Sequence, residues 1–120
     1  MIFQNSGDAG PGMGGTLLVS KAFDQVTMAD AMGKALAAEQ FTDMDCNPIM
    51  DMLGGVNTTM SGWYSYDMQT MVVTPKPNVT YVVRSAGGVL YKLAIQSYYA
   101  TPDGGTTMSG AHYLVKLAAL

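Results

Sequence analysis

The chain has 120 residues, of which 48% are hydrophobic and only 12% charged, and its net charge is -3. This length suits one domain with one core, and the hydrophobic fraction excludes disorder of the highly charged kind. Because nucleic-acid binding usually needs a basic surface, the negative charge argues against a nucleic-acid partner. No apolar run reaches the roughly 18 residues of a membrane helix, and no signal peptide is visible.

The chain has few cysteines and many methionines. Cys46 is the only cysteine, which excludes an intrachain disulfide and zinc-finger chemistry. There are 11 methionines, many for a chain of this length. Methionine either fills gaps in a core or ligates soft metals, and both interpretations apply here.

The first half of the chain predicts little regular structure. Residues 1–15 are a Gly-rich leader that we expect to be flexible, and residues 16–120 form a single β domain. Within this domain, residues 16–23 predict a strand. Residues 42–62 contain Pro, paired Gly, Asn and Asp, and indicate an irregular segment.

One helix is predicted over residues 28–40. Thr27 suits the N-cap position, with Asp30 three residues further on. Gly33 is a weak point that costs about 1 kcal/mol relative to Ala. The apolar residues at helical spacing are Met28, Ala31, Met32, Ala35 and Leu36.

From Trp63 onward, aromatic and β-branched runs alternate with turn residues. This pattern predicts short strands in an antiparallel sheet. The fold class is therefore mainly β, an antiparallel sheet of hairpins with one short N-terminal helix. The predicted strands are 63–66, 71–74, 79–84, 89–96 and 111–118.

Alternation predicts which face of the last two strands is buried. In strand 89–96 the core face carries Val89, Tyr91, Leu93 and Ile95, and Lys92 and Gln96 lie opposite. In strand 111–118 the core face carries Tyr113, Val115 and Leu117, and His112, Leu114 and Lys116 lie opposite.

An ordered set of short motifs spans about residues 56–120. The motifs are Gly62-Trp63-Tyr64 with Tyr66, Pro75-Lys76-Pro77, Tyr81-Val82-Val83-Arg84, Gly88, Tyr91-Lys92-Leu93 and Ser97-Tyr98-Tyr99. In this order and spacing they resemble the HmuY-like family of bacterial heme-binding proteins. The first half of the chain carries no such motif.

The resemblance implies a hemophore, an all-β protein whose hairpins grip one heme without catalysing a reaction. It implies an exported or cell-surface protein, so the signal peptide would lie outside this chain. Its expected partners are heme, host or environmental hemoproteins that supply the heme, and an outer-membrane receptor that accepts it. A homo-oligomer is left open.

The resemblance also points to axial ligands of the iron. Family members use two His or two Met, and the segment before the Pro-Lys-Pro turn often reads Thr-Thr-His. Here it reads Gln69-Thr70-Met71, so Met71 takes the place of the axial histidine. The second ligand is expected near the last hairpin, where Met108 and His112 are the candidates.

Each of these residues also has an ordinary structural interpretation. Met71 alternates with Val73 and would suit a core, Met108 would suit an exposed turn, and His112 would suit a solvated strand face. In a flat meander the two methionines lie well over 10 Å apart by strand spacing. Only a strongly curved sheet, or two chains enclosing one heme, would bring both to the iron.

Aromatic and basic residues complete the predicted heme site. The tyrosines that would stack on a porphyrin are Tyr64, Tyr66, Tyr81, Tyr98 and Tyr99. The alternative role for most of them is cross-strand pairing within the sheet. Arg84 or Lys92 would pair with a heme propionate.

Two functions of other classes remain open. Residues 42–52 contain several soft or acidic ligands: Met44, Asp45, Cys46, Met50 and Met52. This composition is typical of Cu(I) sites, although the same methionines would also plug a core. A self-assembling structural β module, joined through exposed edge strands, is the third class. With nothing to orient the single histidine, we expect no enzyme.

Overall fold

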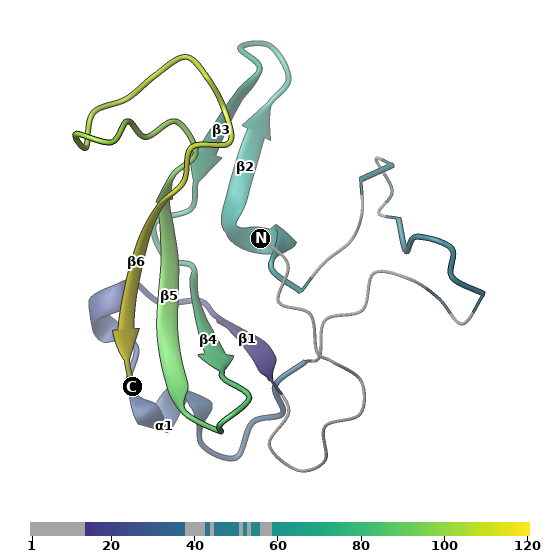
Figure 1. Ribbon diagram of the computed structural model, residues 1–120, viewed down its shortest axis with the longest axis vertical. Coiled ribbons are helices and arrows are strands. Elements are labelled where there is room, and N and C mark those ends of the chain that lie inside the picture. Colours follow the sequence, from purple (N-terminus) through teal and green to yellow (C-terminus); the bar gives the residue numbers. More distant parts are fainter. Residues whose placement is uncertain (1–13, 38–42, 44, 51, 53, 56–58) are drawn as a thin grey trace.

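The computed structural model describes residues 14–37, 43, 45–50, 52, 54–55 and 59–120, and it is mainly β (Figure 1). This confirms the predicted fold class. The strands are β1 (Gly15–Val19), β2 (Tyr64–Asp67), β3 (Val72–Pro75), β4 (Thr80–Arg84), β5 (Leu90–Ser97) and β6 (Leu114–Ala119). The helical elements are η1 (Phe23–Gln25), α1 (Met28–Ala31) and η2 (Ser61–Trp63). None of the described helices is long and apolar enough to span a membrane.

The strands form two antiparallel sheets. The larger has four strands in the order β1-β4-β5-β6, and β2 and β3 form a separate hairpin. The chain leaves β3 at Pro75 and passes Pro77 before β4 begins. Because proline has no backbone N–H, these residues interrupt the ladder and let the hairpin leave the plane of the larger sheet.

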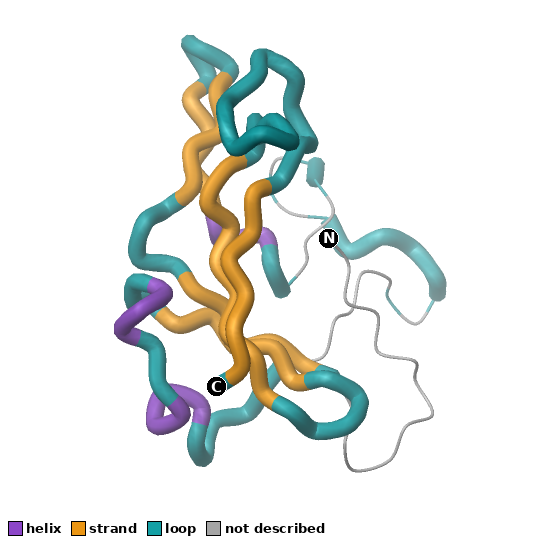
Figure 2. The backbone as a smooth tube through the Cα atoms, turned by 60° about the vertical axis from the view of Figure 1, so that its left-hand side comes forward, coloured by secondary structure: helices purple, strands orange, loops and turns teal. Residues whose placement is uncertain are grey.

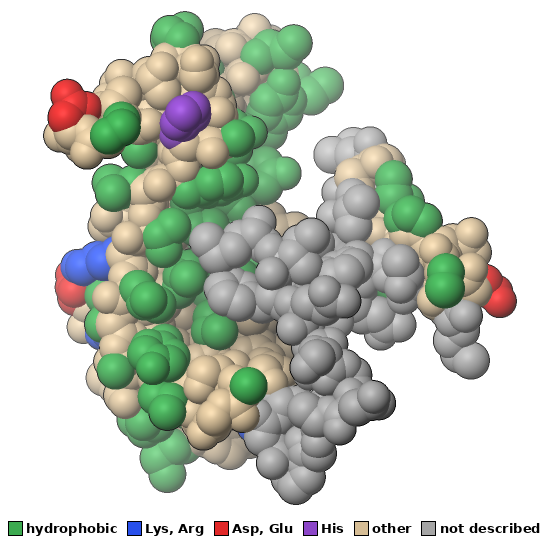
Figure 3. All heavy atoms as spheres, in the orientation of Figure 1, with side chains coloured by type: hydrophobic (Ala, Val, Ile, Leu, Met, Phe, Trp, Pro, Cys, Tyr) green, Lys and Arg blue, Asp and Glu red, His purple; other side chains and the backbone are tan. Residues whose placement is uncertain are grey.

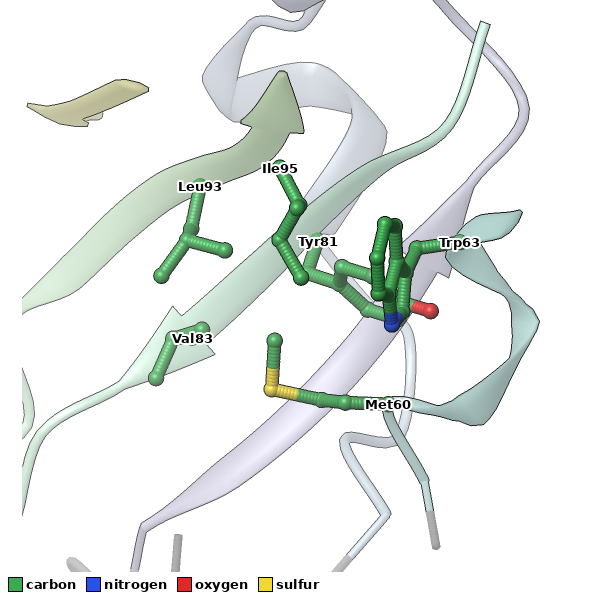
Figure 4. Close-up of a cluster of buried hydrophobic side chains, with 6 residues drawn as sticks. All are labelled: Met60, Trp63, Tyr81, Val83, Leu93 and Ile95. Carbon is green, nitrogen blue, oxygen red and sulfur yellow. The ribbon is translucent and has the colours of Figure 1, made fainter. Parts of the chain in front are cut away.

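One face of the larger sheet packs beneath η2 and the β2–β3 hairpin (Figure 4). The buried residues of this first core cluster are Met60, Trp63, Tyr81, Val83, Leu93 and Ile95. Leu93 and Ile95 lie on the face that alternation predicted. Met60 is the only buried methionine among the described residues, so gap filling does not explain the methionine content.

The opposite face of the sheet is also covered, which the sequence did not predict. Val26 and Ala31, from the segment 21–31, pack against Val19 and Val82 of the sheet in a second buried cluster. Residues on both faces of β4 are therefore buried, and this explains its nearly continuous apolar run. The alternation predicts Lys92 on the face opposite the core, but that face is itself packed.

Lys92 fixes the covering segment to the sheet. Its Nζ donates to the backbone carbonyls of Phe23, at 3.0 Å, and Val26, at 3.1 Å. The same Nζ lies 4.7 Å from the Phe23 ring centroid, and Nζ of Lys116 lies 4.6 Å from it. Lys116 also forms an ion pair with Asp24 at 2.9 Å. These cation–π and charge-assisted contacts give the turn a defined position.

The predicted helix over 28–40 is too long, because α1 covers only Met28–Ala31. The capping interaction is present, since the Asp30 carboxylate accepts the Thr27 backbone N–H at 2.9 Å, but α1 ends at Ala31. Gly33 has φ of +71°, a left-handed conformation that reverses the chain. Beyond it, Ala37 exchanges two backbone hydrogen bonds with Thr16. Pairing with β1 thus replaces the rest of the helix, and residues 38–40 lie outside the described range.

Two strand predictions also need correction. The strand predicted over 16–23 ends at Val19, because the chain turns at Lys21 and enters η1. In β6, Val115 packs against the first cluster, but Leu117 is 60% exposed. The reason is position: β6 is an edge strand, so its core-side residues have neighbours on one side only.

Candidate functional site

Five aromatic rings meet where the β2–β3 hairpin approaches the upper ends of β5 and β6. They belong to Trp63, Tyr64, Tyr98, Tyr99 and Tyr113. Ring centroids are 4.9 Å apart for Trp63 and Tyr64, and 5.4 Å for Tyr98 and Tyr113. The first pair is tilted by 58° and the second packs edge to face at 81°, so the rings form no flat platform.

Tyr99 connects three segments that are distant in sequence. Its hydroxyl accepts the backbone N–H of Val73 in β3 at 3.0 Å. Its carbonyl accepts the N–H of Thr107 at 2.7 Å, and the residue pairs with His112 in an isolated bridge. The β2–β3 turn and the loop between β5 and β6 therefore lie at the same end of the molecule (Figures 1 and 2).

Met71 occupies the turn of the hairpin and not the start of a strand. Its φ of +59° is left-handed, and its side chain is 69% exposed. The core interpretation of Met71 is therefore wrong. The Tyr66 hydroxyl donates to its Sδ at 3.2 Å, which orients the thioether. The Asp67 carboxylate accepts the N–H groups of Gln69 and Thr70, which fixes the turn and lowers the pKa of that carboxyl.

The two candidates for the second ligand lie on the adjoining loop. Met108 is 99% exposed, one residue after the Thr107 that bonds to Tyr99. His112 is exposed. Its backbone bonds to Tyr98 and Ala100, and the imidazole takes no part in these bonds. In Figure 3 some hydrophobic side chains lie at this end of the molecule, and others extend down the same face.

The predicted porphyrin-stacking tyrosines divide into three groups. Tyr64 and Tyr66 are exposed, and Tyr98 and Tyr99 are half-buried. Tyr81 is fully buried in the first core cluster, so the structure excludes it from stacking on a ligand.

Gly110 sets the position of the Tyr98 ring. A Cβ at Gly110 would lie 2.5 Å from Cε1 of Tyr98, so the ring lies directly against this backbone. A larger residue would displace the ring from the cluster.

The structure does not bring the predicted propionate partners to this end. Arg84 ends β4 and pairs with Leu90, at the opposite end of β5 from Ser97 and Tyr98. Lys92 lies on the other face of the sheet, where it bonds to Phe23 and Val26. Both are thus separated from the three candidate ligands.

Sequence reasoning missed two residues of this region. Met68 lies in the same turn as Met71 and is 81% exposed. Tyr113 was assigned to the core face, yet its ring joins the aromatic cluster and remains partly exposed. Burial, and then the neighbouring Tyr98 and Tyr64, raises the pKa of Tyr113. Tyr113 lies within the predicted strand 111–118, whereas the observed β6 begins one residue later, at Leu114.

The predicted copper segment shows no organised site in its described part. Cys46, Met50 and Met52 are exposed, so these methionines do not plug the core as the alternative required. Met44 lies outside the described residues. Within the described ranges, no group of three or more His, Cys, Asp or Glu side chains is placed to hold a metal ion.

Comparison with known protein families, curated proteins and solved structures found no match to this chain.

Proposed function

We propose that this protein binds heme without catalysing a reaction on it, at the end of the molecule organised by Tyr99. Met71 is the first axial ligand and Met108 the second, with His112 as the alternative second ligand. Tyr64 and Tyr98 form part of the wall. In its wider role the protein takes heme from hemoproteins outside the cell and passes it to an outer-membrane receptor, as the motif resemblance implies.

One observation carries the proposal. Each candidate ligand lies within two residues of a bonding partner of Tyr99: Met71 beside Val73, Met108 beside Thr107, and His112 as the partner itself. The three were selected on sequence grounds, at positions up to 41 residues apart. Their meeting at one end of the fold supports a shared ligand.

The chemistry of these side chains suits heme iron. Thioether sulfur is a soft ligand that favours reduced iron and raises its potential relative to imidazole. The Tyr66 hydroxyl engages one lone pair of the Met71 sulfur and leaves the other for a metal. The exposed aromatic edges beside these ligands offer apolar contact to a porphyrin face. Because Arg84 and Lys92 lie elsewhere, we expect the propionates to face solvent.

A visible absorption titration with hemin, repeated after dithionite reduction, tests the proposal. We expect saturation at one heme per chain, or one per two chains, and stronger low-spin bands in the reduced state. Met71→Ala should weaken binding by more than tenfold, which corresponds to about 1.4 kcal/mol.

Met32→Ala is the matched control, because Met32 is 71% exposed and lies next to α1, far from this end. Met108→Ala and His112→Ala then identify the second ligand. An unsaturable response to hemin would contradict heme binding itself. Equal affinities for Met71→Ala and Met32→Ala would refute the ligand assignment.

A further inference from the structure

The outer edge of β6 is open in the described part of the chain. β6 has six residues and pairs with β5 on its inner side. Figure 2 turns this edge toward the viewer, and no other described segment lies in front of it. Leu114 and Leu117 are exposed there, and Lys116 is the only charged residue of the strand.

The register identifies which backbone groups point outward. The Leu120 N–H donates to the Leu90 carbonyl at 3.0 Å, which is a hydrogen-bonded pair in the β5–β6 register. Hydrogen-bonded and non-bonded pairs alternate along an antiparallel ladder. The N–H and C=O groups of Val115, Leu117 and Ala119 therefore point away from β5. In the described part of the chain, no backbone hydrogen bond outside the β5–β6 ladder engages these groups.

The other edge of the sheet is different. Thr16 in β1 donates to Ala37 at 2.9 Å and accepts from Ala37 at 2.8 Å. Ala37 thus covers the outer edge of β1 at Thr16 with the chain's own backbone. Among the described residues β6 is therefore the longer open edge of this sheet, and pairing through one such edge per molecule stops at a two-fold dimer.

We propose that β6 is a self-association surface, and that its occupant is the β6 of a second copy, paired antiparallel about a two-fold axis at Leu117. In this register Leu117 meets Leu117 of the second copy, and Val115 meets Ala119. These are the residues whose backbone groups point outward, so each such group gains a partner. The exposed Leu117 side chains cover one another at the axis.

The charge pattern favours this register over its neighbour. Lys116 lies opposite Ala118 of the second copy, and its own Asp24 already neutralises it at 2.9 Å. A register centred on Lys116 would place two lysines directly opposite, which destabilises a strand pair.

The interface is small, so the dimer is weak. Stable interfaces bury about 1,200–2,000 Å² in total, and one pair of six-residue strands covers less than this. We therefore expect dimerisation to depend on concentration. The two-fold axis places the two proposed heme sites, each beside Tyr99, at opposite ends of the dimer. This dimer is therefore different from one in which two chains enclose a single heme.

Sedimentation equilibrium of the full chain without ligand tests the proposal. Between about 5 µM and about 1 mM, the average mass should rise from 12.7 kDa toward twice that value and stop there. Leu117→Lys should remain monomeric, because it places two ammonium groups at the axis. Val89→Lys adds the same charge at an exposed turn position outside this edge, and should behave as the wild type.

Amide hydrogen exchange gives a second readout. At high concentration the Leu117 and Ala119 amides should become protected, while the Ala118 amide, which points to β5, is protected throughout. A wild-type chain that stays monomeric across the range would overturn the proposal. So would growth beyond a dimer, or dimerisation of a folded Leu117→Lys variant.

Discussion

At the scale of single residues, the hydroxyls of Tyr81 and Tyr99 differ in their hydrogen bonding. The Tyr81 hydroxyl is buried beside Gly62 and has no hydrogen-bond partner among the described residues. The Tyr99 hydroxyl accepts the Val73 N–H. Burial raises the pKa of Tyr81 to about 12 and outweighs the opposing effect of the nearby Gly62 backbone.

Replacing each tyrosine by phenylalanine separates the two cases. Tyr81→Phe removes an unpaired buried polar group and should raise the free energy of unfolding by about 1 kcal/mol. Tyr99→Phe leaves the Val73 N–H without its acceptor and should lower it by about 1 kcal/mol. Urea unfolding of both variants measures this difference. If Tyr81→Phe is destabilising to the same extent, the Tyr81 hydroxyl has a bonded partner and its assignment as unpaired is wrong.

At the scale of elements, the segment 21–31 depends on one carboxylate. The Asp30 side chain accepts hydrogen bonds from Lys21 Nζ at 2.6 Å and from the Thr27 N–H at 2.9 Å. The bond from Lys21, followed by that from Thr27, lowers the pKa of Asp30 from 3.8 to about 2. Lys21 and Thr27 flank η1, so the same carboxylate helps to close the turn over the second core cluster.

This pKa gives a stability contribution with a defined pH window. Because the folded pKa lies below the unfolded value, the contribution is complete above pH of about 4 and is lost as the pH falls toward about 2. Asp30→Asn should abolish this part of the acid dependence. Urea unfolding of both proteins at several pH values gives the difference in their free energy of unfolding. The contributions of the other carboxylates are the same in both proteins and cancel in this difference. Parallel wild-type and Asp30→Asn curves between pH 4 and pH 2 would contradict the coupling.

The elements also show what local sequence determines. The alternation of Leu93 and Ile95 with Lys92 predicted β5, because successive side chains of a strand point to opposite faces of a sheet. The helix over 28–40 failed because a helix this short depends on tertiary packing, and Gly33 allowed the chain to pair with β1 instead. Spacing alone does not show that competing long-range partner.

At the scale of the whole molecule, the sequence indicated the type of candidate ligand but not its setting. The spacing to the Pro-Lys-Pro turn singled out Met71, yet its position in a turn follows from the Asp67 bonds to Gln69 and Thr70. The role of Tyr99 was not predictable, since its partner Val73 is 26 residues away. The position of Arg84 was not predictable for the same reason, because only the sheet register places it at the far end of β5.

The most direct test of the central claim locates bound heme on the folded chain. In a ¹H–¹⁵N spectrum, ferric hemin should broaden the amide signals of Met71, Thr107 and His112. The signals of Met32 and Leu90 should persist. Gallium protoporphyrin, which is diamagnetic, should shift the first group without broadening it. Hemin broadening centred on the segment 21–31, or spread evenly over the chain, would contradict a heme site organised by Tyr99.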